Sequence, residues 1–170
     1  MTLASWITLL RCFGGPLVAF FVQFPDKRYL AAYLFVAFAL TDWLDGFIAR
    51  RTNTITNFGK YIDPFADKIL VMSVFVAMTY FRLLPLWGVL IVLIREMAVM
   101  LIRIIGVERK KILAASWSAK FKTVVQMAAV FVNLMGWPYA LPLFWFAVVV
   151  TVYSFLEYVW VNRKLFVQIG

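Results

Sequence analysis

Apolar residues occur along this chain in six long stretches, separated by short segments that contain proline, glycine or charged residues. Each stretch has about the ~20 residues that a helix needs to cross the ~30 Å hydrocarbon core of a bilayer. The short connections favour antiparallel neighbours in a helical bundle. The sequence therefore predicts an all-α, polytopic membrane protein, a bundle of six transmembrane helices at residues 6–24, 29–50, 61–81, 84–105, 118–137 and 139–161.

Composition supports a membrane location. Of 170 residues, 65% are hydrophobic and 15% are charged, with a mean hydropathy of +0.90, whereas soluble domains carry ~25% charged residues. The six stretches leave little chain for a soluble domain, so we expect residues 1–170 to form one compact membrane domain. A single cysteine and the lack of histidine exclude an internal disulfide and argue against a zinc site.

Lysine and arginine are unevenly distributed among the connections. They are abundant after the second and fourth stretches and in the C-terminal tail, whereas the opposite side has only Lys27, Arg28 and Arg82. Because cytoplasmic segments carry the excess of basic residues, both termini are predicted to be cytoplasmic. The net charge of +9 is explained by this rule and by anionic lipid head groups, and we expect no nucleic-acid partner.

Four aspartates lie at the cytoplasmic ends of the second and third stretches: Asp42, Asp45, Asp63 and Asp67. An ionised carboxylate at membrane depth is costly, so four together imply a compensating charge. At helical spacing, each pair shares one face. Hard oxygen ligands suit Mg²⁺ or Mn²⁺, and four carboxylates are enough to hold two such ions. The sequence therefore predicts a site with two divalent metal ions.

Small residues lie on the same helix face as the first aspartate pair. Gly46 and Ala49 would let a ligand approach the backbone there, and Arg50 follows directly. This combination is typical of a diphosphate-binding groove. The alternatives are an Asp-Gly turn, helix caps, or ion pairs of the aspartates with Arg50, Lys68 or Arg95. They account for one aspartate better than for four.

These residues follow the spacing D-x2-D-G-x2-A-R-x8-G-x3-D-x3-D, which resembles the signature of the CDP-alcohol phosphotransferases. Every fixed position is present: Asp42, Asp45, Gly46, Ala49, Arg50, Gly59, Asp63 and Asp67. Residues 54–68, 94–96 and 114–126 are most similar to the bacterial phosphatidylglycerophosphate synthases of that family. Two positions depart from that subgroup, since its Asn-Ile-Pro-Asn opening is absent and Ala119 replaces a glycine.

The resemblance implies transfer of the phosphatidyl group of CDP-diacylglycerol to glycerol 3-phosphate, with release of CMP, in bacterial phospholipid synthesis. It implies a homodimer in the cytoplasmic (inner) membrane, with its active site facing the cytoplasm. Asp42, Asp45 and Asp63 would be metal ligands, and Asp67 both a metal ligand and the catalytic general base. The nucleotide and diphosphate would lie along Asp42, Gly46, Ala49, Arg50 and Gly59.

Glycerol 3-phosphate carries two negative charges, so its phosphate needs converging cations. Arg95, Arg103, Lys120 and Lys122 lie in the predicted cytoplasmic halves of the fourth and fifth stretches, and we expect them to bind the acceptor phosphate. Alternatively, Arg95 could pair with the adjacent Glu96, and the lysines could reach lipid head groups.

Two other kinds of function remain open from the sequence. Other members of the resembled family use other acceptors, among them cardiolipin synthases, phosphatidylinositol phosphate synthases and phosphatidylserine synthases, and the shared signature does not separate them. Intramembrane aspartates also occur in small cation or proton transporters. A conduction path would continue polar residues to the far end of the second and third stretches, which is apolar.

Overall fold

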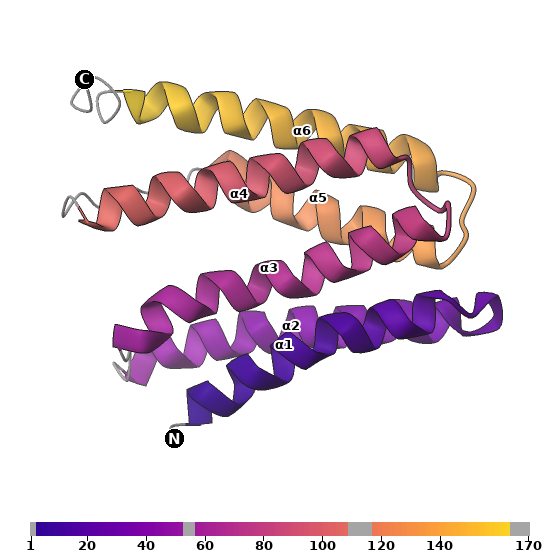
Figure 1. Cartoon of the computed structure of the whole chain (residues 1–170), viewed down its shortest axis with the longest axis horizontal. Helices are drawn as coiled ribbons and strands as arrows, with labels where there is room; N and C mark the ends of the chain where they lie inside the picture. The colour runs from indigo at the N-terminus through magenta and orange to yellow at the C-terminus, as the bar shows by residue number, and fades with distance from the viewer. Residues whose placement is uncertain (1–2, 53–56, 109–116, 164–170) are drawn as a thin grey trace. The chain divides into compact units, whose positions relative to one another are not determined.

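The computed structural model describes the backbone of residues 3–52, 57–108 and 117–163, and the side chains of residues 13–41, 68–106 and 117–163. The described backbone contains no strand. Its elements are α1 (Leu3–Val22), the 3-10 helix η1 (Pro25–Lys27), α2 (Arg28–Thr52), α3 (Asn57–Tyr80), α4 (Leu86–Glu108), α5 (Trp117–Leu134) and α6 (Ala140–Val161) (Figure 1). The all-α class and the six helices are confirmed, and each helix boundary lies within four residues of its prediction.

The chain forms two compact units. The first contains Met1–Leu84 together with Val130–Trp137, and the second contains Pro85–Ala129 together with Pro138–Gly170. Helices α1, α2 and α3 therefore belong to the first unit and α4 and α6 to the second, while α5 contributes residues to both. The expectation of one membrane domain over residues 1–170 stays a prediction.

In the first unit, two adjacent glycines bring α1 close to two helices. A Cβ atom on Gly14 would lie 3.0 Å from the ring of Phe38 on α2, and one on Gly15 would lie 2.9 Å from Cα of Leu70 on α3. Real Cβ atoms do not approach a backbone atom that closely, so a larger residue at Gly15 would separate α1 from α3. Pro16 follows inside α1 without ending it.

Helices α3 and α5 end in the same hydrogen-bonding pattern. After α3, Leu83 N–H donates to Met78 O (2.8 Å) and Arg82 N–H to Thr79 O (3.0 Å). After α5, the amides of residues 137 and 136 donate to the carbonyls of residues 132 and 133 (3.2 and 3.0 Å). These are Schellman motifs, which place one residue in the left-handed region. That residue is Gly136 (φ 68°) after α5, and the non-glycine Arg82 (φ 56°) after α3.

In the second unit, α4 and α6 lie side by side and run in the same direction (Figure 1). Gly88 permits the approach, because a Cβ atom there would lie 2.5 Å from the buried ring of Phe144. Helix α5 packs against α6 through a small apolar cluster formed by Val125, Ala129, Ala147 and Leu143.

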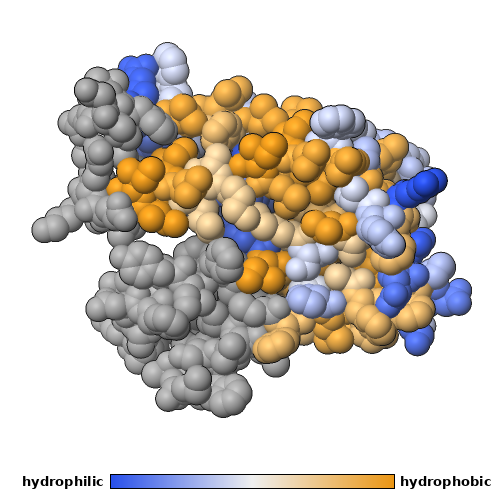
Figure 2. Space-filling view, viewed as in Figure 1, coloured by the Kyte–Doolittle hydropathy of each residue, from blue (hydrophilic) through white to orange (hydrophobic). Residues whose placement is uncertain are grey.

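Large apolar side chains cover much of the surface of the second unit. Figure 2 shows that the visible face over α4 and α6 is dominated by hydrophobic residues. Of the helices whose residues are described, α6 alone is both long and apolar enough to cross a membrane by length and composition. Helix α4 also carries Arg95, Glu96 and Arg103, which lower its apolar character. Six membrane spans stay a prediction.

Candidate active site

The signature residues lie on two consecutive helices of the first unit, which run in opposite directions (Figure 1). Asp45 and Asp42 are seven and ten residues before Thr52, the last residue of α2, and Asp63 and Asp67 are six and ten residues after Asn57, the first of α3. At ~1.5 Å rise per residue, the two pairs lie at matching depths of about 10 and 15 Å from the ends of their helices. Helix α2 also carries Gly46, Ala49 and Arg50, and α3 carries Gly59.

The donor set of these positions fits a hard divalent cation. Four aspartates supply only oxygen ligands, the set that Mg²⁺ and Mn²⁺ prefer. Their side chains lie outside the described residues, and the side chains that are described contain no group of three or more candidate metal ligands. Metal binding by Asp42, Asp45, Asp63 and Asp67 therefore stays a prediction, supported by their placement along the backbone.

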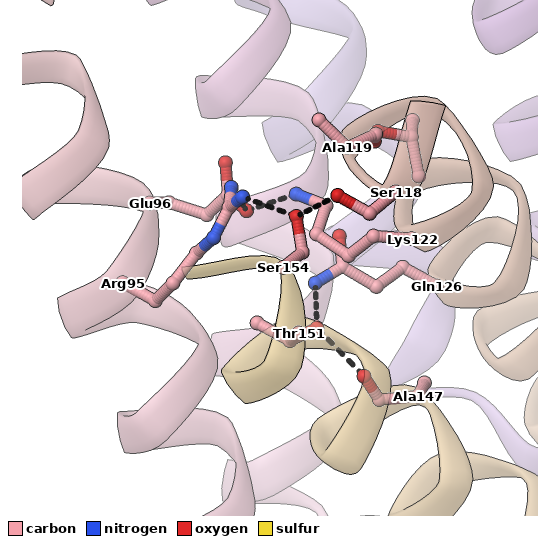
Figure 3. A network of polar contacts seen from close by, with 10 residues as sticks. Arg95, Glu96, Ser118, Ala119, Lys122, Gln126, Ala147, Thr151 and Ser154 are labelled. Carbon is pink, nitrogen blue, oxygen red and sulfur yellow. Dashed lines mark hydrogen bonds and ion pairs between the residues drawn. The ribbon is translucent and has the colours of Figure 1, made fainter. Parts of the chain in front are cut away.

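The second unit contains a buried charged cluster formed by Arg95 and Glu96 of α4 and Lys122 of α5 (Figure 3). Arg95 Nη1 donates to Glu96 Oε1 at 3.1 Å, and the Lys122 ammonium pairs with the same oxygen. Lys122 is 2% exposed and Arg95 is 6% exposed. Two buried cations therefore share one carboxylate oxygen. Their N–H groups suit an anionic ligand, which would offset part of the cost of burying them.

Hydroxyl and amide groups extend the cluster towards α6. Arg95 Nη2 donates to Ser154 Oγ at 3.0 Å, and the Ser118 hydroxyl donates to the same oxygen at 3.4 Å. Gln126 Nε2 donates to Thr151 Oγ1 at 2.8 Å, and that hydroxyl donates to the Ala147 carbonyl at 2.6 Å (Figure 3). These bonds hold the buried ends of long side chains in fixed positions across three helices.

The four predicted acceptor-site residues are thus divided. The structure brings Arg95 and Lys122 together through Glu96. Arg103 and Lys120 are exposed, Arg103 interacts electrostatically with Arg95, and the Lys120 ammonium lies 5.3 Å from the centre of the Trp117 ring. The alternative that Arg95 pairs with Glu96 is confirmed. Binding of the acceptor phosphate by the four residues stays a prediction.

Sequence reasoning missed the contribution of α6 to this cluster. Thr151 and Ser154 are fully buried and Tyr158 is nearly so. Their spacing of i, i+3 and i+7 places them on one helix face. A polar stripe at helical spacing inside an apolar stretch was the signal that could have found them. The bridging role of Glu96 was visible only as one of the alternatives for Arg95.

Known proteins are similar to this chain over most of its length. Residues 1–153 match the model of the CDP-alcohol phosphatidyltransferase family. The chain is 37% identical to a CDP-diacylglycerol–glycerol-3-phosphate 3-phosphatidyltransferase of Bacillus subtilis over 142 residues, which are 79% of this chain and 74% of that protein. It is 30% identical to the protein of the same name in Sodalis glossinidius, over 96% of both chains. It is 37% identical to a probable phosphatidylglycerophosphate synthase of Mycobacterium tuberculosis, over 87% of this chain and 72% of that protein.

These matches extend from α1 into α6 and include both the signature helices and the charged cluster. The resemblance to the CDP-alcohol phosphotransferases, which was inferred from the signature, is confirmed. The chain belongs to the CDP-alcohol phosphatidyltransferase family.

Proposed function

We propose that the protein transfers the phosphatidyl group of CDP-diacylglycerol to glycerol 3-phosphate, giving phosphatidylglycerophosphate and CMP in phospholipid biosynthesis. The observation that carries this proposal is the complete signature on α2 and α3, with its aspartate pairs at matching depths. The names of the relatives support the choice of donor and acceptor. The two buried cations that share Glu96, Arg95 of α4 and Lys122 of α5, support a phosphorylated acceptor.

The donor would bind along α2. Gly46 and Ala49 would leave room beside the backbone for the nucleotide and the diphosphate. Asp42, Arg50 and Gly59 would complete this part of the site. Two divalent ions, Mg²⁺ or Mn²⁺, would be held by Asp42, Asp45, Asp63 and Asp67. Bound ions would supply neutralisation of the diphosphate charge during the displacement. The aspartates orient the donor so that the phosphorus of the phosphatidyl group faces the acceptor hydroxyl.

Asp67 would act as the general base. It accepts the proton of the primary hydroxyl of glycerol 3-phosphate while the hydroxyl oxygen forms a bond to the phosphatidyl phosphorus. The bond from that phosphorus to the oxygen bridging it to CMP breaks, and CMP leaves with the electron pair. Asp67 is on α3, one turn after Asp63, which allows one carboxylate of the pair to face the hydroxyl.

Arg95 and Lys122 would bind the acceptor phosphate. Both are buried cations held by Glu96, and their N–H groups suit the oxygens of a phosphate. Arg103 and Lys120, which are exposed, would attract the dianion at longer range. Glu96 and Ser154 keep the guanidinium of Arg95 in one orientation before the acceptor arrives.

The proposed setting is the bacterial inner membrane, with six membrane-spanning helices, both termini and the active site on the cytoplasmic side, and a homodimeric assembly. The high proportion of apolar residues, the apolar surface of α4 and α6 and the uneven distribution of basic residues support the membrane orientation. The homodimer rests on the family resemblance.

Release of CMP by the full-length protein, purified in detergent, tests the proposal. CDP-diacylglycerol is supplied with Mg²⁺ or Mn²⁺ and one acceptor at a time: glycerol 3-phosphate, phosphatidylglycerol, inositol 1-phosphate or serine. We expect release with glycerol 3-phosphate alone, its loss on chelation of the metal, and a fall of about 10²- to 10⁴-fold in Asp67→Asn. Turnover of another acceptor would overturn the assignment of the acceptor, and metal-independent release would overturn the metal site.

A further inference from the structure

Three buried side-chain atoms in the second unit have no hydrogen-bond partner among the residues that the structure describes: Arg95 Nε, Tyr158 Oη and Glu157 Oε2. Polar atoms that are removed from water are nearly always paired, because leaving one unpaired costs free energy. Two of the three can donate a hydrogen bond, and they belong to residues that are 6% and 2% exposed. Unpaired donors on and beside the buried guanidinium of Arg95 indicate that an anion binds there.

Tyr158 lies beside Arg95 in the second unit. Arg95 Nη2 bonds to Ser154 of α6, and Tyr158 follows Ser154 by four residues, one turn further along the same buried face. Tyr158 is among the titratable groups that surround the Arg95 guanidinium. The phenol and the guanidinium are therefore neighbours across the α4–α6 interface.

Both terminal nitrogens of the Arg95 guanidinium already bond to protein groups. Arg95 Nη1 bonds to Glu96 and Nη2 to Ser154, which fixes the guanidinium and leaves Nε–H available. Fixed guanidinium and phenol donors suit a phosphate, whose oxygens only accept. Glu157 Oε2 is an acceptor and would repel the same group, so Glu157 takes no part in the binding.

We infer that Tyr158 is a phosphate-binding residue, whose hydroxyl, together with Nε of Arg95, donates to the phosphate of the acceptor substrate. The inference rests on the proposed function for the identity of that acceptor, glycerol 3-phosphate, and on the unpaired donors for the phosphate group itself. It extends the acceptor site from α4 and α5 to α6, in which the sequence analysis named no site residue.

Tyr158→Phe in the full-length protein tests the inference, with Tyr153→Phe as the matched control. Tyr153 is on the same helix and 64% exposed, so its substitution removes the same hydroxyl from the outer surface. We expect Tyr158→Phe to raise the KM for glycerol 3-phosphate about 10-fold, the effect of losing one hydrogen bond to a charged group. The KM for CDP-diacylglycerol should not change, and Tyr153→Phe should leave both values unchanged.

Thermal stability without substrate separates binding from a structural role. Replacing an unpaired buried hydroxyl with hydrogen should leave the Tm of Tyr158→Phe equal to or above that of the wild type. A lower Tm together with an unchanged KM for glycerol 3-phosphate would show that the hydroxyl bonds to protein or buried water, and would overturn the inference.

Direct binding distinguishes this inference from the proposed function. Inorganic phosphate and glycerol 3-phosphate should each raise the Tm of the wild type and of Tyr153→Phe, and raise that of Tyr158→Phe much less. If the wild type released no CMP with glycerol 3-phosphate but showed this pattern, the proposed function would fail and the phosphate site would stand. If CMP were released while all three proteins bound both probes equally, the function would stand and the role of Tyr158 would be refuted.

Discussion

Glu96 is the residue that links two buried cations of the second unit. Its one carboxylate oxygen pairs with both Arg95 and Lys122, and all three residues are buried. Removing one partner of a buried ion pair leaves a charge that neither water nor protein compensates. Glu96 therefore has a structural role, because it holds the two cations in place.

Glu96→Gln is expected to destabilise the protein by about 3 kcal/mol, the lower range for breaking a buried pair. The glutamine keeps the size of the side chain but removes the negative charge that both cations share. Thermal unfolding in detergent measures the effect, with Asp26→Asn as the control because Asp26 is an exposed carboxylate of η1. Equal Tm values for the two variants would contradict the central role of Glu96.

Lys122→Gln should have a different effect. Glu96 would keep Arg95 as its partner, so the stability should change less than in Glu96→Gln. Binding of the acceptor phosphate should weaken, because one charge-assisted hydrogen bond is worth about 1.5–3 kcal/mol, or 10-fold or more in KM for glycerol 3-phosphate. Lys120→Gln, at an exposed position, should change this KM much less. A larger effect of Lys120→Gln would assign the phosphate contact to the exposed lysine.

Pairs of helices pack closely where one of them has a glycine. Gly88→Ala is expected to destabilise the second unit by about 1–3 kcal/mol, because its Cβ atom would overlap the buried ring of Phe144 and separate α4 from α6. The Tm in detergent measures this change, and Gly88→Ala combined with Phe144→Leu should recover part of it. If the single substitution left the Tm unchanged, α4 and α6 would not be as close as described.

Substitutions in the two Schellman motifs are expected to change stability in opposite directions. Gly136→Ala has open space around its Cβ atom but forces a side chain into the left-handed region, so we expect a loss of about 1 kcal/mol. Arg82→Gly relieves the same strain after α3 and should increase stability by a similar amount. Thermal unfolding of both variants checks the pair. Shifts of Tm in the same direction would show that φ is not the deciding factor.

The sequence predicted the helices well because each apolar stretch has the length of a helix and is bounded by proline, glycine or charged residues. The left-handed residue after α5 is a glycine, which favours that conformation, whereas the one after α3 is Arg82, a residue type that does not. For the site, the aspartates were found from their spacing along the chain. The polar face of α6 was not predicted, because threonine and serine are common inside apolar helices. Only the packing of the helices shows that Thr151 bonds to Gln126 and Ser154 to Arg95.

At the scale of the whole molecule, the distribution of basic residues predicts the orientation in the membrane. The connection between α4 and α5 contains Arg109, Lys110 and Lys111, whereas the connection between α1 and α2 has only Lys27 and Arg28 beside Asp26. Retaining basic segments in the cytoplasm places the first connection inside and the second outside. The signature aspartates would then open to the cytoplasm, where glycerol 3-phosphate is available.

Labelling of single cysteines tests this orientation. Lys27→Cys and Lys110→Cys are each introduced with Cys12→Ser, which removes the one native cysteine, and CMP release shows that each variant is folded. A membrane-impermeant maleimide added to intact spheroplasts should label the variant at position 27, which lies in the exposed η1, and should label the variant at position 110 only after lysis. Labelling at position 110 in intact spheroplasts would place the α4–α5 connection outside the cell. Two helices, α3 and α4, separate it from the α2–α3 connection, so both connections lie on the same side of the membrane. The proposed catalytic aspartates would then open to the outside, and the cytoplasmic placement of the site would have to be abandoned.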